Sequence, residues 1–220
     1  MSNQYRTVPV LTWGGDLRMY MKGNGYEYIK KTILCLILAL LVYFTCMPVC
    51  IYAWDIHLRP EREWGVLMGY GYQWPSWAQS TPEEVRLTTF YPTFGLLNIR
   101  QGDWKVQLEI EGIFGYRTNE EKGVILGASP VIRIMNTRPG IIIPYVNLGA
   151  GGTYNDMNLT GMGSRWNFSL EGGAGAQLNI SSDLSLRFEY RLLHLSNAGL
   201  AEENRALNAN LVLVGIWYSF

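Results

Sequence analysis

The sequence is poor in residues that form disulfides or thiolate sites. Its three cysteines, Cys35, Cys46 and Cys50, all lie within residues 1–53. The rest of the chain therefore has no thiol for a disulfide, a thiolate metal site or a cysteine nucleophile. Histidine is nearly as scarce, since only His57 and His194 are present.

Charged side chains are also few. Asp, Glu, Lys and Arg make up 16% of the residues, against about 25% in typical soluble domains. The 18 basic residues are balanced by 18 acidic ones, so no excess of positive charge is available to bind nucleic acid through its phosphates. The aromatic content of 13% excludes a disordered chain, which combines low hydrophobicity with high net charge.

One apolar run stands out, and it is short for a membrane-spanning helix. Residues 33–44 read ILCLILALLVYF and follow Lys30 and Lys31. A spanning helix needs about 20 apolar residues, whereas a shorter run behind basic residues is typical of a secretory signal peptide. Ala53 is the small residue expected beside the cleavage site. An uncleaved anchor over residues 32–53 is the alternative.

Residues 54–220, which follow the predicted leader at residues 1–53, alternate apolar and polar side chains with a period of two. Such alternation predicts β-strands. Eight segments of this kind are expected, at residues 63–74, 85–98, 104–117, 123–135, 141–154, 167–180, 184–195 and 207–220. An even number of strands about ten residues long is typical of an antiparallel outer-membrane β-barrel. A soluble secreted β-sandwich, whose strands also alternate, is the alternative.

The polar positions within these segments favour the barrel. In the seventh segment, leucine and aromatic residues alternate with Arg187, Glu189 and Arg191. The interior of an eight-stranded barrel is just wide enough for side chains to fill it. We therefore expect these three residues to pair inside the barrel with Glu109 and Glu111. The fourth and fifth segments alternate less clearly.

The last segment ends on an aromatic residue. Its apolar side chains share one face, at Val212, Val214, Ile216, Tyr218 and Phe220. This ending resembles the closing strand that the bacterial barrel assembly machinery recognises in outer-membrane proteins. Together with the leader, it predicts a location in the bacterial outer membrane, with lipid around the barrel and both barrel termini in the periplasm.

His194 and Ser196 lie near the end of the seventh segment. Residues two apart share one face of a strand, and here that face looks out into lipid near the outer rim. A histidine that accepts the serine proton makes the serine a nucleophile for an ester. The same spacing is common by chance in a polar girdle. His57 lies among charged residues and is expected at the solvated rim.

The string HLSNAG at residues 194–199, with Asn204 beyond it, resembles the PagL-type lipid A 3-O-deacylases. The resemblance covers the strand layout of most of the chain after Ala53 and the motif near its end. It implies an eight-stranded outer-membrane barrel with a serine hydrolase site on its outer surface. Such enzymes remove the ester-linked 3-hydroxyacyl chain at position 3 of lipid A in lipopolysaccharide, without a metal or other cofactor.

The resemblance also implies roles for individual residues. Ser196 matches the family's nucleophile and His194 matches its base. Asn197, Gly199 and Asn204 match the segment that forms or supports the oxyanion hole. Hydrogen-bond donors at such a position stabilise the tetrahedral intermediate, usually a large catalytic contribution.

One position departs from the family's pattern. The triad acid of the family lies fourteen residues after the histidine, where this sequence has Asn208. An asparagine can accept a hydrogen bond from the imidazole, but it carries no charge and can hold the wrong tautomer. The Asp→Asn change in a serine-protease triad, a case from another protein, lowers turnover about 10⁴-fold. Glu202 and Glu203, in the following loop, are the alternative acids.

Three functions therefore stay open at the level of sequence. A lipid A deacylase removes an acyl chain from lipopolysaccharide. A small structural or adhesive barrel with a degenerate site leaves lipid A unchanged, and an acyltransferase barrel adds mass to it. The sequence does not indicate the oligomeric state.

Overall fold

The structure is a computed structural model that describes residues 57–59, 62–73, 80–119, 121–138 and 140–220. Within these residues the chain forms nine β-strands, namely β1 (His57–Arg59), β2 (Glu63–Gln73), β3 (Val85–Gln101), β4 (Trp104–Arg117), β5 (Gly123–Asn136), β6 (Ile142–Asn155), β7 (Trp166–Asn179), β8 (Leu184–Ser196) and β9 (Leu207–Ser219). No helix in this described part is long and apolar enough to cross a membrane. The predicted leader, its cleavage at Ala53 and the division into residues 1–53 and 54–220 lie outside the described residues and stay predictions.

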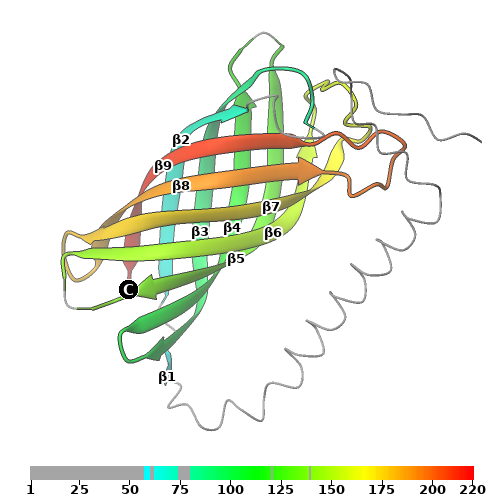
Figure 1. Cartoon of the computed structure of the whole chain (residues 1–220). Coiled ribbons are helices and arrows are strands. Elements are labelled where there is room, and N and C mark those ends of the chain that lie inside the picture. The colour runs from blue at the N-terminus through cyan, green and yellow to red at the C-terminus, as the bar shows by residue number, and fades with distance from the viewer. Residues whose placement is uncertain (1–56, 60–61, 74–79, 120, 139) are drawn as a thin grey trace, which may run out of the picture. The chain divides into compact units, whose positions relative to one another are not determined.

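Strands β2 to β9 form a closed antiparallel barrel (Figure 1). Each strand pairs with the next one along the chain, and β9 pairs with β2 from Glu63↔Ser219 to Gln73↔Ala209. The predicted eight-stranded barrel is confirmed. The sandwich alternative is wrong, because a sandwich consists of two separate sheets and this sheet closes on itself. The short strand β1 was not predicted, and it pairs with the far end of β3.

The two ends of the barrel differ. The connections β4–β5, β6–β7 and β8–β9 lie at one end, called here the loop end. The tight connections β3–β4, β5–β6 and β7–β8 lie at the opposite end, together with the start of β2 and the last residues of β9. This polarity matters because β8 ends, and β9 begins, at the loop end.

The outer surface of the barrel is apolar. Large hydrophobic side chains stand exposed on every strand of the barrel, as Phe188 (52% exposed) and Val212 (67% exposed) illustrate. A contiguous apolar surface of this extent is unfavourable in water. It matches the outward-facing band of a transmembrane barrel, whose surroundings are lipid chains.

The predicted interior network is present and buried. Arg187 forms an ion pair with Glu109 at 3.1 Å. Arg191 forms ion pairs with Glu111 and with Glu189, both at 2.5 Å. All five side chains are at most 4% exposed. The prediction that these residues meet inside the barrel is confirmed.

Arg133 on β5 completes this network, and the sequence pattern missed it. Its guanidinium contacts Glu109 at 2.8 Å, Glu111 at 3.2 Å and Glu189 at 3.1 Å. The pattern failed because the inward face of β5 also carries apolar residues, such as Ile125 and Val131. With apolar side chains on both faces, the strand shows little alternation.

Towards the loop end the interior becomes apolar. A buried cluster there includes Leu193 and Leu195 from β8 and Leu207 from β9. Side chains of the β6–β7 connection, Met157 and Met162 among them, belong to the same cluster. These inward-pointing leucines hold the ends of β8 and β9 in place, so the residues between them must point outward.

Candidate active site

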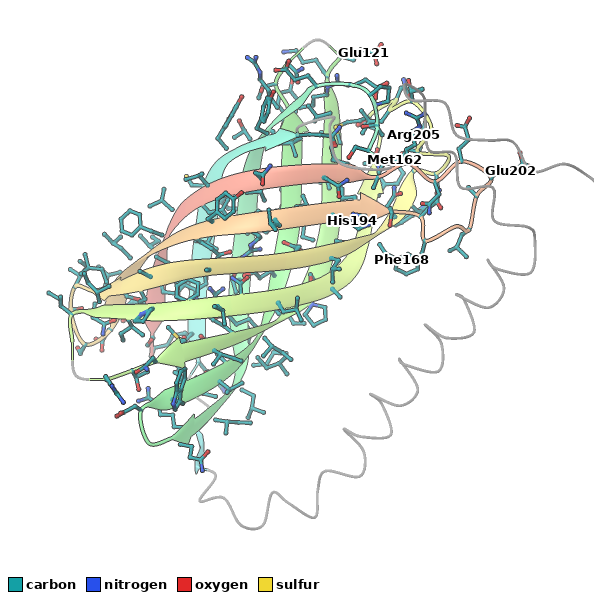
Figure 2. The ribbon with its side chains drawn as sticks, in the orientation of Figure 1. Glu121, Met162, Phe168, His194, Glu202 and Arg205 are labelled. Atoms are coloured by element: carbon teal, nitrogen blue, oxygen red, sulfur yellow. The ribbon has the colours of Figure 1, made fainter. Side chains whose placement is uncertain are left out.

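The outward residues at the ends of β8 and β9 bring the predicted site together. Leu193 and Leu195 are buried, so His194 and Ser196 project to the outside of the barrel, where His194 lies near the loop end (Figure 2). The register of the two strands pairs His194 directly with Asn208. Facing residues of an antiparallel pair have Cβ atoms about 5 Å apart. The spacing of fourteen residues thus follows from the register of one hairpin.

Ser196, His194 and Asn208 form a hydrogen-bonded series. The Ser196 hydroxyl lies 3.0 Å from His194 Nε2. On the other side of the ring, His194 Nδ1 lies 2.7 Å from Asn208 Oδ1. A carbonyl oxygen only accepts, so Nδ1 carries the hydrogen and donates it to Asn208. Nε2 then has a free lone pair facing the serine, which is the tautomer that a general base requires.

Asn208 is held from its other side by two residues that sequence reasoning missed. Its Nδ2 donates to Ser80 Oγ at 2.8 Å, and its backbone N–H donates to Gln73 Oε1 at 2.8 Å. Gln73 Nε2 donates in turn to Thr81 Oγ1 at 2.8 Å. Gln73, Ser80 and Thr81 are all buried. Closure of the barrel, which places the end of β2 beside the start of β9, is the signal that could have indicated them.

The segment predicted to form or support the oxyanion hole is a tightly bonded loop. Asn197 Nδ2 donates to the backbone oxygens of Met162 and Glu203, both at 2.7 Å. The Asn197 backbone N–H donates to Asn204 Oδ1 at 3.1 Å, and the Gly199 N–H donates to Asn197 Oδ1 at 2.9 Å. These donors are engaged within the loop, so Asn197 and Gly199 act here as loop supports. Asn204 Nδ2 has no acceptor among the described residues.

The backbone conformation of this loop explains why residue 199 is a glycine. Ala198 has a φ of 53° and Gly199 a φ of 78°, so two successive residues occupy the left-handed region. Glycine adopts that region without steric cost, whereas other residues do so at a penalty. The turn returns the chain from β8 towards β9 directly after Ser196.

A second loop contact lies beside the site. Glu83 Oε1 accepts a hydrogen bond from the Thr160 backbone N–H at 3.0 Å. Partial burial raises the pKa of Glu83, but the hydrogen bonds from Thr160 and from the residue's own backbone N–H, together with the charge of Arg117, outweigh it, and the net pKa is below the ordinary value. The carboxylate therefore stays ionised at neutral pH and ties the segment after Ser80 to the β6–β7 connection.

The alternative acids do not occupy the position beside the histidine. Asn208 contacts His194 Nδ1, whereas Glu202 and Glu203 do not. Glu202 lies out on the β8–β9 loop (Figure 2). His57 is far from the site, because its backbone pairs with Arg100 at the end of β3 opposite the loop end. In the described part of the chain, no group of three or more His, Cys, Asp or Glu is placed to hold a metal ion.

An apolar groove runs from the site across the outer face of β6 to β9. It has a volume of about 640 Å³, and its lining includes His194, Asn208, Leu170 and Leu192. Gly172 lies in the lining and pairs across the sheet with Leu148 on one side and Leu192 on the other. The missing side chain at Gly172 leaves the surface hollow between its leucine neighbours. This shape suits a flexible hydrocarbon chain beside His194 and Asn208.

Comparisons with known proteins agree with this fold. The family model described as "Lipid A 3-O-deacylase (PagL)" matches residues 53–217. The crystal structure of the outer membrane enzyme PagL is similar with a TM-score of 0.53 and 16% identity, over 72% of this chain and 99% of that chain. Neisserial surface protein A is similar with a TM-score of 0.55 and 11% identity, over 74% of this chain and 99% of that chain. At these identities the two structures support the fold alone. No curated protein matches the sequence significantly.

Proposed function

Because the chain belongs to the PagL family of lipid A 3-O-deacylases and folds as an outer-membrane barrel, we propose that it is a serine esterase of lipopolysaccharide. It removes the ester-linked 3-hydroxyacyl chain from position 3 of lipid A. The observation that carries this proposal is the series of hydrogen bonds from Ser196 through His194 to Asn208 on the lipid-facing surface. If His194 and Ser196 were side by side only by chance in a polar girdle, no hydrogen-bond acceptor would be expected at His194 Nδ1.

The first half of the reaction forms an acyl-enzyme. Ser196 Oγ attacks the ester carbonyl carbon while His194 Nε2 takes the hydroxyl proton. Asn208 Oδ1 accepts the hydrogen bond of Nδ1–H throughout, which keeps the ring in place. The carbonyl oxygen becomes an oxyanion, and Asn204 Nδ2 is the uncommitted donor of the adjoining loop that can stabilise it. The bond from the carbonyl carbon to the sugar oxygen then breaks, and His194 returns the proton to that oxygen.

The second half releases the fatty acid. A water molecule attacks the acyl carbon on Ser196 and gives its proton to His194 Nε2. The bond between the acyl carbon and Ser196 Oγ breaks, and the serine recovers its proton from the histidine. The products are a free 3-hydroxy fatty acid and lipid A with a free 3-hydroxyl group. No other reactant is needed.

The surroundings of the serine support lipid A as the substrate. An acyl chain bound along Leu170, Gly172 and Leu192 would lie in the apolar groove with its ester at the level of His194. With both barrel termini in the periplasm, the loop end faces the cell exterior. The site would then lie in the outer leaflet, where lipopolysaccharide is found.

Mass spectrometry of lipid A from cells that express the protein tests the proposal. We expect the native chain to remove one 3-hydroxyacyl group, and the Ser196→Ala and His194→Ala variants to remove none. Heat-dependent migration in gel electrophoresis verifies that each barrel is folded. Unchanged lipid A from a folded native barrel would overturn the proposal in favour of a non-catalytic barrel. A gain in mass would indicate an acyltransferase.

A further inference from the structure

The outer face of the barrel continues past Ser196 towards the loop end, and there it carries aromatic side chains. Ser196 on β8 pairs across the sheet with Phe168 on β7, whose side chain lies near His194 in Figure 2. Residues two apart share one face of a strand, so Trp166 projects outward as Phe168 does. Trp166 is 72% exposed and meets the ring of Tyr154 on β6 edge to face, with centroids 5.2 Å apart. The nucleophile of the proposed reaction therefore lies beside an aromatic surface.

Arg165, the residue before β7, adds a positive charge to this surface. Its Nη1 donates to the Tyr154 hydroxyl at 3.4 Å, so the guanidinium lies next to the aromatic pair. The Arg165 carbonyl accepts a hydrogen bond from the Asn155 N–H at 2.8 Å, which holds the backbone at this position. Arg165 is exposed, and it forms no ion pair with any residue that the structure describes. A guanidinium has five N–H donors, so most of them are left for an anion.

The outer side chains along β7 change in character with distance from the loop end. After the charged Arg165 they are, in order, Trp166, Phe168, Leu170 and Gly172. Ser196 lies opposite Phe168, between the aromatic part and the apolar groove. A phosphorylated glycolipid has the same order, from phosphate through sugar ring and ester to acyl chain. With the acyl chain at Gly172 and the ester at Ser196, the sugar would lie over the aromatic side chains and a phosphate would lie at Arg165.

We propose that Arg165 binds a phosphate group of lipid A and thereby places the ester of the substrate at Ser196. The proposal rests on the proposed esterase function and adds a headgroup site to it. Trp166 is two residues from Phe168, the partner of Ser196, and two residues of strand span about 7 Å. One glucosamine ring with its phosphate can cover that distance. Arginine presents paired N–H groups to a phosphate, and such charge-assisted hydrogen bonds are stronger than neutral ones.

Initial rates of the purified protein with phosphorylated and with dephosphorylated lipid A test this site. We expect Arg165→Gln to lower kcat/KM for phosphorylated lipid A about tenfold, the scale of one charge-assisted hydrogen bond, mainly by raising KM. Arg165→Lys keeps the charge but loses the paired N–H groups, so its loss should be smaller. With dephosphorylated lipid A, the native chain and Arg165→Gln should have the same KM, because the phosphate that Arg165 binds is then absent.

Lys122→Gln is the matched control for the loss of one positive charge. Lys122 is also exposed, and it lies in the β4–β5 connection with its Nζ 5.7 Å from the centre of the Tyr116 ring. Strand β6 separates β5 from β7, so Lys122 is not beside the serine. We expect this variant to keep the native KM for phosphorylated lipid A.

Binding of lipid A to inactive protein gives a readout that does not depend on turnover. The Ser196→Ala variant and the double variant Ser196→Ala/Arg165→Gln are titrated with lipid A in detergent micelles. Native mass spectrometry then counts the lipid A molecules on each barrel. We expect the added Arg165→Gln change to weaken binding of phosphorylated lipid A about tenfold, and to leave binding of dephosphorylated lipid A unchanged.

The outcomes separate the two proposals. Unchanged KM and unchanged binding of phosphorylated lipid A in the Arg165→Gln variants would overturn the phosphate site. Equal losses with phosphorylated and dephosphorylated lipid A would also overturn it, because Arg165 would then only anchor the barrel among other lipids. If the native chain leaves lipid A intact while Ser196→Ala binds phosphorylated lipid A through Arg165, the esterase function fails and the phosphate site stands.

Discussion

At the scale of single residues, Asn208 retains one of the two properties of a triad acid. It accepts the hydrogen bond of His194 Nδ1 at 2.7 Å, which orients the ring. It does not offer a negative charge to the imidazolium that forms in the proposed reaction when Ser196 loses its proton. Orientation and charge can therefore be measured separately in this chain, because the orienting contact is already present.

Restoring the charge should raise the rate. We expect Asn208→Glu to increase kcat by about tenfold, well below the roughly 10⁴-fold loss known for the reverse change in a protease triad, because Asn208 already supplies the acceptor. A carboxylate beside the ring favours its protonated form, so the acidic limb of the rate–pH profile should move to higher pH. Both quantities come from initial rates of fatty acid release. The double variant Ser196→Ala/Asn208→Glu should be inactive, and an unshifted limb would contradict the argument.

Residues on one hairpin were easier to predict than residues joined by closure of the barrel. Period-two alternation and the spacing along the chain relate His194, Ser196 and Asn208 to one another, so the sequence was enough to put them on one outer face. Ser80 and Gln73 reach Asn208 across 128 and 135 residues. No local pattern relates such positions, because their contact depends on how the last strand meets the first.

At the scale of strands, the bounds of most elements were well predicted, whereas the inner face of β5 was not. The segments expected at residues 123–135 and 141–154 end within one residue of β5 and β6. By contrast, β3 continues to Gln101 where the expected strand ended at residue 98, because its last residues pair with the start of β4 on one side and with β1 on the other. Side chains inside the barrel turned out charged in the middle and apolar near the loops, so alternation alone could not identify Arg133.

Gly172 gives a test of the groove at the level of the sheet surface. A Cβ at Gly172 would lie 3.8 Å from the nearest Leu148 carbon, so the sheet can accept a side chain there. We expect Gly172→Leu to fill the groove and lower kcat/KM by about tenfold, chiefly through KM, since a lost apolar contact is worth about 1–3 kcal/mol. The assay is fatty acid release over a range of lipopolysaccharide concentrations.

Gly152 provides the matched control for this experiment. It lies on neighbouring β6, outside the groove lining, and a Cβ there meets no atom within 4 Å. Gly152→Leu should therefore leave KM near its native value. Equal effects of the two substitutions, or no effect of Gly172→Leu, would show that the acyl chain does not lie along β7.

At the scale of the whole molecule, the outer face of the barrel is apolar and its interior is charged in the middle, and both faces contribute to its stability. Outside, exposed apolar side chains require lipid, and inside, three arginines, five glutamates and Lys105 share one network. A buried charge that loses its partner cannot be compensated by water. The interior thus keeps β4, β5, β7 and β8 together and provides a rigid wall on which the site is built.

Removing Arg133 should destabilise the whole barrel. Three carboxylates, Glu109, Glu111 and Glu189, contact its guanidinium. Loss of one partner from a buried ionic network costs about 3–5 kcal/mol, so Arg133→Ala should lower the free energy of unfolding in urea by that amount. Arg138→Ala is the control, because its pair with Asp103 is 77% and 50% exposed and such pairs contribute at most about 1 kcal/mol. Both are measured in lipid vesicles. Equal losses in the two variants would mean that the interior charges are solvated, and that the apolar cluster near the loops alone holds the wall beneath His194.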